Sequence, residues 1–557
     1  LAGMTRRANT SGSHDRSILL SGLAGLTILL TTSCGGGSDD AAANAQIAKL
    51  LPESTVAVVR IASLDELNKH KRTITEEMGE TDDGLDVRDL LAMSGMPGDA
   101  RLIDPSLPIV LAVTSKRATP PTIAVVVPTT DTAAFAESLK AMQITATIDG
   151  NYVVVPVFGT YKRAETAPQI LSNLKPGALS MHANLEPLTS TYKMAINSGI
   201  EMFEKQITDM MEMADPNIDG EVIAELYGSI GRAMSESAKT LDVSAGYKDG
   251  MLDLDVALDV LPGSAMAGWS SPATDLQPLA AGMTGKGALE VLFQMDTRKM
   301  MPRFNDLLDA VADIYPPEFQ TTMKDLMATY EAIYEQIDSG MIIEGDLFGD
   351  EGLRMTAQMT PKDPAKYVTL ITDLAHRDSM KQLGLTADVP KTSTDGDTNI
   401  CDLNIAIDSK KMLAVTGQQS PQQEQTSQAF QAMFADGLHI RIAQRDKRVV
   451  MTFGEGREAA ATATLDADQG TWSPAIQTAV DRLEGCNPMV VERIDMARLM
   501  AGVFASMAQA GTNVPAVPED ASANMIFYGG IRGDQWRGGL SIDVAGFGEQ
   551  ARLLMPR

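Results

Sequence analysis

The chain has 557 residues, with 46 Lys or Arg against 73 Asp or Glu, so its formal net charge is −27. An acidic surface repels phosphate backbones and no basic cluster interrupts the sequence, so we expect no nucleic-acid partner. Hydrophobic residues make up 44% of the chain, which is enough to bury substantial cores, and the length predicts more than one domain.

Residues 1–33 have the three parts of a secretory signal peptide. Arg6, Arg7 and Arg16 form a basic start, an apolar stretch covers residues 18–30, and small residues lead on to Cys34. The apolar stretch is too short to span a bilayer as a helix, which takes about 20 apolar residues. We therefore expect residues 1–33 to be removed on secretion.

Leu30 and three small residues come directly before Cys34. This run resembles the cleavage box of bacterial lipoproteins, with the Leu one place earlier than is most common. The resemblance covers residues 4–40. It implies attachment of a lipid such as palmitate to Cys34 and anchoring to a membrane of the bacterial cell envelope, outside the cytoplasm. The alternative is a soluble secreted protein in which Cys34 carries no lipid.

Residues 34–46 consist mainly of Gly, Ser, Asp and Ala without an apolar period, so we expect a flexible tether between the lipid and the folded part. Gly35, rather than Asp, follows the cysteine. By resemblance to the sorting rules of enteric bacteria, this implies the outer membrane if the host is Gram-negative.

One construction recurs at four places in the rest of the chain. An apolar strand is followed by Ser, Asp or Asn, with a Leu or Met four residues later. Such a polar side chain caps the free N–H groups of a new helix, and the apolar residue one turn later faces the core. The four copies are Val56–Ile61 with Ser63 and Leu67, Ala178–Ala183 with Asn184 and Leu188, Ala288–Met295 with Asp296 and Met300, and Met489–Ile494 with Asp495 and Leu499.

Hairpins follow the predicted helices. In the clearest, Val243–Tyr247 leads through a turn at Lys248-Asp249-Gly250 into Leu252–Val260, where apolar residues alternate with polar ones, mostly Asp. This alternation predicts a strand with one face buried and the other in water. Leu353–Met359 and Leu540–Val544 repeat the pattern.

The copies also pair with one another. Asp131 and Asp363 begin matching helices, each with an aromatic residue, Phe135 or Tyr367, on the predicted inner face. Further on, Val153–Gly159 is similar to residues 449–454.

We therefore predict an α+β fold in which helices cover antiparallel sheets. Residues 47–262 and 287–557 form two duplicated halves, each of two strand–helix–hairpin modules. Residues 263–286, rich in Pro, Gly, Ser and Ala, form a linker. The opening of the folded part, Leu51–Ile61, resembles that of uncharacterised extracytoplasmic lipoproteins, which implies no activity.

Asp215, Asn217 and Asp219 stand at positions 1, 3 and 5 of a candidate calcium loop, with Gly220 at position 6. Oxygen ligands at this spacing, followed by a turn glycine, suit Ca²⁺. Leu226 replaces the bidentate Glu of position 12, so the alternative is a polar turn between two helices. Calcium is the one cofactor that the sequence suggests.

Cys401 and Cys486 are the cysteines beyond Cys34. In an oxidising compartment they could form a disulfide, which would stabilise the fold by about 4 kcal/mol. The alternative is two separate buried thiols.

Methionine is abundant, with 33 residues in the chain, and it gathers in two predicted helices. We interpret this group as ordinary core, and the alternative is a soft lining for an apolar ligand or a partner helix. The group comprises Met202, Met210, Met211, Met213, Met234 and Ile230.

No catalytic motif appears, so the sequence favours a lipid-anchored extracytoplasmic binding or scaffold protein without enzymatic activity, bound to an unknown protein or ligand. One alternative is a carrier of an apolar ligand or lipid, held in a cavity between the sheet and the Met-rich helices. The other is a hydrolase that acts on envelope material through two carboxylates from distant segments, and two buried carboxyls facing each other in a cleft would favour it.

Overall fold

The computed structural model describes residues 40–554 except 80–83, 94–95, 116–121, 215–219, 265, 269–276, 295–316, 350–351, 409, 413–436, 455–457, 468–469, 471, 510–515 and 519. The fold is α+β with a large antiparallel sheet, as the sequence predicts. Two compact units make up the described chain. Unit 1 holds the residues up to Pro187 together with Asp242–Leu254, and unit 2 holds Leu188–Leu241 and the residues from Asp255 onward.

Unit 1 contains an antiparallel sheet with the strand order β4-β5-β3-β2-β1-β6. Four α-helices accompany it among the described residues. The strands are β1 (Thr55–Ile61), β2 (Ile109–Thr114), β3 (Ile123–Pro128), β4 (Thr147–Asp149), β5 (Tyr152–Phe158) and β6 (Leu179–Asn184). The helices are α2 (Asp40–Ala48), α3 (Leu64–Glu77), α4 (Val87–Met93) and α5 (Thr132–Ala141).

Both faces of the unit 1 sheet are covered. Val153 and Val155 of β5 pack in one cluster with α3, α4 and α5, whereas Tyr152 and Val154 pack in a second cluster with Ile47 of α2. A strand that is buried on both faces needs apolar residues at successive positions, which explains the continuous valine run in β5.

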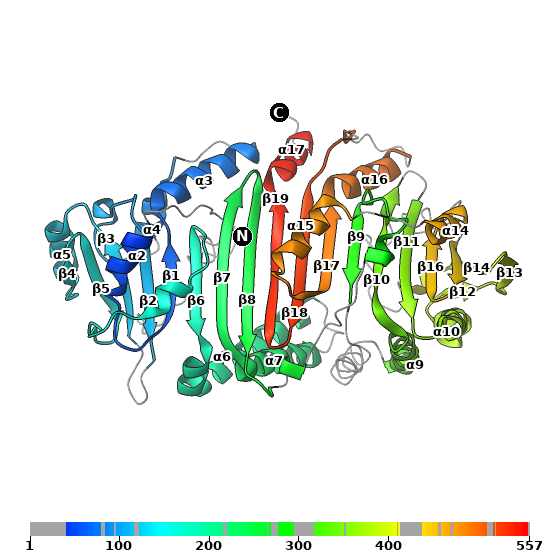
Figure 1. Ribbon diagram of the computed structural model, residues 1–557, viewed down its shortest axis with the longest axis horizontal. Helices are drawn as coiled ribbons and strands as arrows, with labels where there is room; N and C mark the ends of the chain where they lie inside the picture. The colour runs from blue at the N-terminus through cyan, green and yellow to red at the C-terminus, as the bar shows by residue number, and fades with distance from the viewer. Residues whose placement is uncertain are drawn as a thin grey trace. The chain divides into compact units, whose positions relative to one another are not determined.

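Unit 2 contains an antiparallel sheet whose strands follow the order β19-β18-β17-β9-β10-β11-β16-β15-β14, with β12 and β13 both paired to β14 (Figure 1). These strands are β9 (Leu289–Phe293), β10 (Ile337–Gly349), β11 (Gly352–Pro361), β12 (Leu385–Ala387), β13 (Lys391–Asp395), β14 (Thr398–Ile407), β15 (Leu438–Arg445), β16 (Arg448–Phe453), β17 (Asn487–Asp495), β18 (Asn524–Arg532) and β19 (Gln535–Asp543). The helices that follow Asp255 are α9 (Pro317–Tyr334), α10 (Pro364–His376), α11 (Asp378–Gln382), α14 (Glu458–Asp466), α15 (Pro474–Arg482), α16 (Met496–Gln509) and α17 (Val544–Leu554).

The order of strand pairing repeats along the chain. The pairs β1–β2, β2–β3, β3–β5 and β1–β6 have the counterparts β9–β10, β10–β11, β11–β16 and β9–β17. The duplicated halves and their boundaries stay a prediction, which this repeated order favours.

The predicted helix starts are confirmed where the structure describes them. Ser63 accepts a hydrogen bond from the N–H of Glu66 at 3.0 Å, and Asp363 accepts one from Lys366 at 3.0 Å. Asp495 accepts one from Arg498 at 3.3 Å. Asn184 directly precedes α6 (Leu185–Ala214), and the start predicted at Asp296 lies outside the described residues.

The hairpin of β7 (Ala238–Lys248) and β8 (Met251–Val260) is confirmed, with positive φ at Asp249 and Gly250. The predicted water-facing side of β8 is only partly open, because its aspartates are half-buried and have protein partners. Asp255 accepts a hydrogen bond from Tyr528, and Asp259 accepts one from Thr240 at 3.0 Å. Val544, predicted in a strand, is instead the first residue of α17.

The interpretation of the methionine group as core is wrong for three of its members. Met202 and Met210 of α6 and Met234 of α7 (Gly220–Ser237) are 60%, 56% and 45% exposed. The two helices run antiparallel, because Lys193 lies 3.5 Å from Glu236 and Glu204 lies 2.8 Å from Arg232. The side chains of Met211, Met213 and Ile230 lie outside the description.

Helix α5 provides a test of the capping argument. Asp131 accepts hydrogen bonds from the N–H groups of Ala133 at 3.1 Å and Ala134 at 2.9 Å. We expect Asp131→Ala to lower the free energy of unfolding of unit 1 by about 1 kcal/mol in urea titrations, because two N–H groups lose their acceptor. Glu137→Ala is the control, because its exposed ion pair with Lys140 is worth less than about 0.5 kcal/mol. Equal effects of the two substitutions would contradict the capping role.

Candidate functional site

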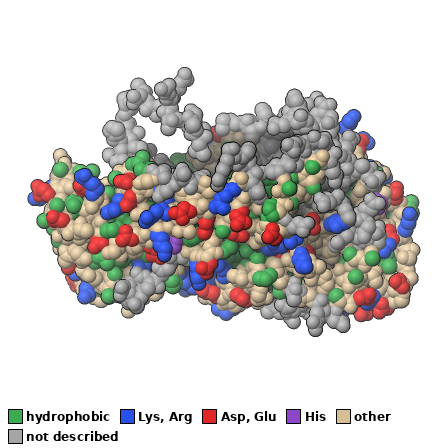
Figure 2. Space-filling view, turned by 90° about the horizontal axis from the view of Figure 1, so that it is seen from above, with side chains coloured by type: hydrophobic (Ala, Val, Ile, Leu, Met, Phe, Trp, Pro, Cys, Tyr) green, Lys and Arg blue, Asp and Glu red, His purple; other side chains and the backbone are tan. Residues whose placement is uncertain are grey.

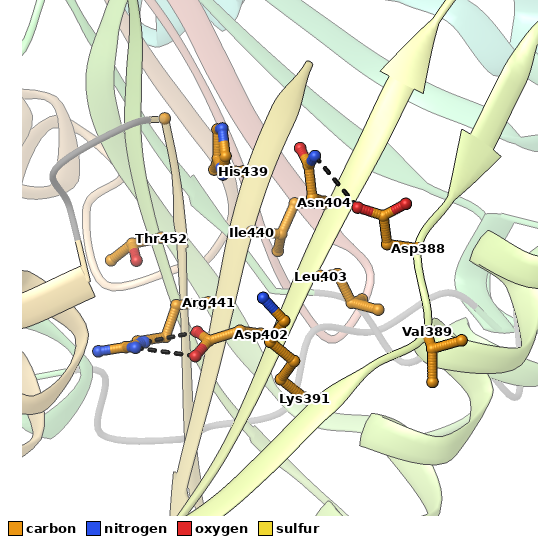
Figure 3. A pocket seen from close by; sticks show the side chains of 11 residues that line it. Asp388, Val389, Lys391, Asp402, Leu403, Asn404, His439, Ile440, Arg441 and Thr452 are labelled. Atoms are coloured by element: carbon orange, nitrogen blue, oxygen red, sulfur yellow. Dashed lines mark hydrogen bonds and ion pairs between the residues drawn. The ribbon is translucent and has the colours of Figure 1, made fainter. Parts of the chain in front are cut away.

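A polar groove lies on one face of the sheet in unit 2, over strands β13 to β16. Cys401, Leu403 and Ile405 of β14 point into the core behind the sheet. The residues between them, Asp402 and Asn404, therefore face the other side, because successive side chains of a strand alternate between faces. Both line a groove with a volume of about 290 Å³ (Figure 3).

The register of the strands arranges the polar side chains in two rows. In the first, Lys391 stands opposite Asp402, Asp402 opposite Arg441, and Arg441 opposite Thr452. In the second, Asn404 stands opposite His439. Each row draws its members from neighbouring strands, so the groove exists only when these strands are paired.

Two polar pairs lie within the groove, as Figure 3 shows. Arg441 donates to both carboxylate oxygens of Asp402, from Nε at 2.6 Å and from Nη2 at 2.8 Å. Asn404 donates to Asp388 at 3.4 Å. The bidentate geometry locks Arg441 and Asp402 together, so this pair forms a rigid floor.

The segment between β12 and β13 forms one wall of the groove. Its backbone is held twice: Asp388 donates its N–H to the carbonyl of Asn404 at 2.9 Å, and His376 donates from Nε2 to the carbonyl of Asp388 at 2.8 Å. Val389 follows, with an exposed fraction of 83%. The wall is therefore fixed in place while its side chains remain accessible.

Gly454 also lines the groove and donates its N–H to the carbonyl of His439 at 2.9 Å. Its φ is +106°, and a Cβ at this position would collide with the carbonyl oxygen of Leu353. A side chain here is excluded both by the backbone conformation and by the neighbouring strand.

A second candidate, two buried carboxylates on adjacent strands, bears on the hydrolase alternative. Glu344 of β10 stands opposite Glu290 of β9, and they are 8% and 6% exposed. Arg493 of β17 stands opposite Glu290 in turn and forms a buried ion pair with it. The three side chains make one charged row across three strands.

The loop before β9 binds Glu344. The carboxylate accepts hydrogen bonds from the N–H groups of Thr284 at 2.7 Å, Lys286 at 2.9 Å and Gly287 at 3.1 Å, and from the Thr284 hydroxyl. Burial acts to raise the pKa of Glu344, but these hydrogen bonds outweigh it and hold the pKa below its ordinary value. The carboxylate is therefore ionised at neutral pH.

The space beside these two glutamates is about 10 Å³, which is room for no more than one water molecule. Both carboxylates already have protein partners. This pair stabilises the sheet and leaves no room for a substrate, so it does not provide the carboxylate site that the hydrolase alternative needs.

The predicted calcium ligands Asp215, Asn217 and Asp219 and the predicted lipid attachment site Cys34 all lie outside the described residues. Within the described chain, no group of three or more His, Cys, Asp or Glu is placed to hold a metal ion. No described helix is both long and apolar enough to cross a membrane. Calcium binding and lipidation stay predictions.

Cys401 and Cys486 are both free thiols. Cys401 belongs to the cluster beneath β14, and Cys486 to a different cluster beside α15. Burial raises the pKa of both thiols, which keeps them protonated and unreactive at neutral pH.

The groove residues are not among the site residues predicted from the sequence. A signal was present, because β14 alternates Cys401, Leu403 and Ile405 with Asp402 and Asn404. That alternation predicts which side chains share a face, but it does not predict which strand lies opposite.

No family model matches the chain, and no curated protein matches it. Among solved structures, crystal form III of TP0453 aligns with 49% of this chain and 97% of its own, at 8% sequence identity and a TM-score of 0.21. A likeness at this level carries no argument about the function of this chain.

The Glu344 interaction predicts a pH-dependent stability. Because its folded-state pKa is lowered, Glu344 contributes stability that is present above its ordinary pKa of 4.5 and is lost as the pH falls through the folded value. We expect Glu344→Gln to lower the free energy of unfolding at neutral pH by about 2–4 kcal/mol, because N–H donors lose a charged acceptor. We expect urea titrations at several pH values to show that the difference in free energy of unfolding between Glu344→Gln and the unsubstituted protein becomes smaller at acidic pH.

Glu335→Gln is the matched control for this series, because Glu335 is exposed in the same unit. We expect it to follow the unsubstituted protein at every pH. If the difference in free energy of unfolding between Glu344→Gln and the unsubstituted protein stayed constant down to strongly acidic pH, this would contradict the role of the ionised Glu344 carboxylate.

Proposed function

We propose that this protein is a lipid-anchored binding protein of the bacterial cell envelope, outside the cytoplasm, and that it has no catalytic activity. The groove over β13 to β16 supports a binding role. It combines a rigid floor, a fixed wall and accessible polar side chains, which are the features of a preformed ligand site.

The chemistry of the groove favours binding over catalysis. Its described lining contains neither Ser nor Cys. Its histidine, His439, has no carboxylate partner among the described residues to orient the ring for proton transfer. Asp402 is engaged by Arg441 and is therefore not available as a general base.

A partner with an apolar surface is the second candidate ligand. The exposed side chains of Met202, Phe203 and Met210 on α6 support it. Flexible methionine side chains adapt to varied apolar surfaces. This candidate fits the scaffold role or the lipid-carrier role.

The anchor is tested by metabolic labelling with a palmitate analogue in a bacterial host. We expect the unsubstituted protein to be labelled and Cys34→Ala to be unlabelled, because the thiol of Cys34 is the proposed attachment site. Cys401→Ala is the control and keeps its label, since Cys401 is a buried thiol. Labelling of Cys34→Ala at the unsubstituted level would contradict the anchor.

The binding role is tested by mass spectrometry of small molecules that the purified full chain retains after dialysis. His439→Trp fills the groove with a bulky residue that suits a strand. We expect it to lose a polar ligand that the unsubstituted protein retains. Thr394→Trp, on the exposed edge strand β13, is the control and retains the ligand.

Melting temperatures of both Trp variants show whether each is folded. A polar ligand retained equally by the two variants would contradict binding in the groove. A lipid retained by both variants would instead favour the carrier role.

A further inference from the structure

Two charged side chains of the groove are exposed to solvent. Lys391 and Asp388 are both exposed: Asp388 lies in the wall segment, and Lys391 begins β13 directly after it. Lys391 makes no ion pair with a carboxylate in the described chain, although Asp402 stands opposite it. Among the described residues, the Asp388 carboxylate receives only the 3.4 Å hydrogen bond from Asn404.

The ion pair on the floor of the groove does not include either of these two charges. The Asp402 carboxylate is bound at both oxygens by Arg441, and within the described chain it makes no ion pair with the Lys391 ammonium group. An ammonium group and a carboxylate that lie in one groove, neither of them in an ion pair within the described chain, suit a ligand that carries the complementary groups.

The acidic and basic side chains of the groove balance one another, although the chain as a whole is acidic. The net charge is −27, and on the described part of the face in Figure 2 acidic and basic side chains are interspersed. In the groove, Lys391 and Arg441 balance Asp388 and Asp402. A small anion is therefore repelled less in the groove than the net charge of the chain alone would imply.

We infer that the groove binds a small carboxylate that has an ammonium or hydroxyl group beside it, as in an amino acid or a hydroxy acid. Lys391 holds the carboxylate, and Asp388 accepts a hydrogen bond from the neighbouring group. Val389, which is exposed at the rim, contacts an apolar part of the ligand. This inference rests on the proposed binding role and names the ligand class.

The test is calorimetric titration of the detergent-solubilised full chain with four probes of one shape. Leucine carries a carboxylate and an ammonium, 2-hydroxy-4-methylpentanoate a carboxylate and a hydroxyl, 4-methylpentanoate a carboxylate alone, and leucinol no carboxylate. We expect the first two to bind and the last two to bind more weakly by about tenfold or more, because each lacks one of the two charged or hydrogen-bonded contacts.

Two substitutions locate the contacts. We expect Lys391→Gln to weaken the binding of leucine about tenfold, because the ligand carboxylate loses its cation. Leucine and leucinol then bind to this variant with similar affinity. We expect Asp388→Asn to weaken the binding of leucine more than the binding of 4-methylpentanoate. Lys447→Gln is the control and leaves binding unchanged, since Lys447 lies outside the groove, in the turn between β15 and β16.

Three outcomes overturn the inference: no binding of either leucine or the hydroxy acid, leucinol binding as tightly as leucine to the unsubstituted protein, or no effect of Lys391→Gln. In each case, the binding role would still be supported if the unsubstituted protein retained a polar ligand after dialysis and His439→Trp lost it. Failure of both experiments would contradict the binding role itself. Preference for leucine or for the hydroxy acid identifies which of the two sources supplies the ligand.

Discussion

Side chains alternate between the two faces of a strand, and the register of neighbouring strands decides which of them meet. Between β14 and β15 this register sends Leu403 and Ile440 into the core and places Asp402 against Arg441 on the groove side. A slip of one residue would bury the charged side chains and expose the apolar ones. The core, the ion pair and the groove therefore depend on the same register.

Charged rows cross the sheet of unit 2 at two places, with different consequences. In the first, Glu290 and Arg493 are paired and the loop before β9 surrounds Glu344. Each of these three charged groups has protein partners and water has almost no access to them, so this row stabilises the fold. In the groove, the row ends at Lys391, which faces solvent. That difference separates charges that stabilise the protein from charges that are available to a ligand.

Local features were predictable because their causes are local. A cap such as Asp131 acts within its own first turn, and a turn such as Asp249-Gly250 depends on its own φ angles. Predictions failed where a distant segment supplies the environment. Asp255 looks water-facing in the sequence, but Tyr528 binds it, and Met202 looks like core although no described segment buries it.

The sequence by itself determined the α+β class, the helix starts and the alternation of β14, because capping and side-chain periodicity act over a few residues. Only the tertiary structure decided that Asp388, Asp402 and Arg441 share one groove, because strand pairing brings together residues far apart in the chain. The tertiary structure also decided that the carboxylates of Glu290 and Glu344 are bound by protein groups. No spacing in the sequence indicates that the loop before β9 folds back onto Glu344.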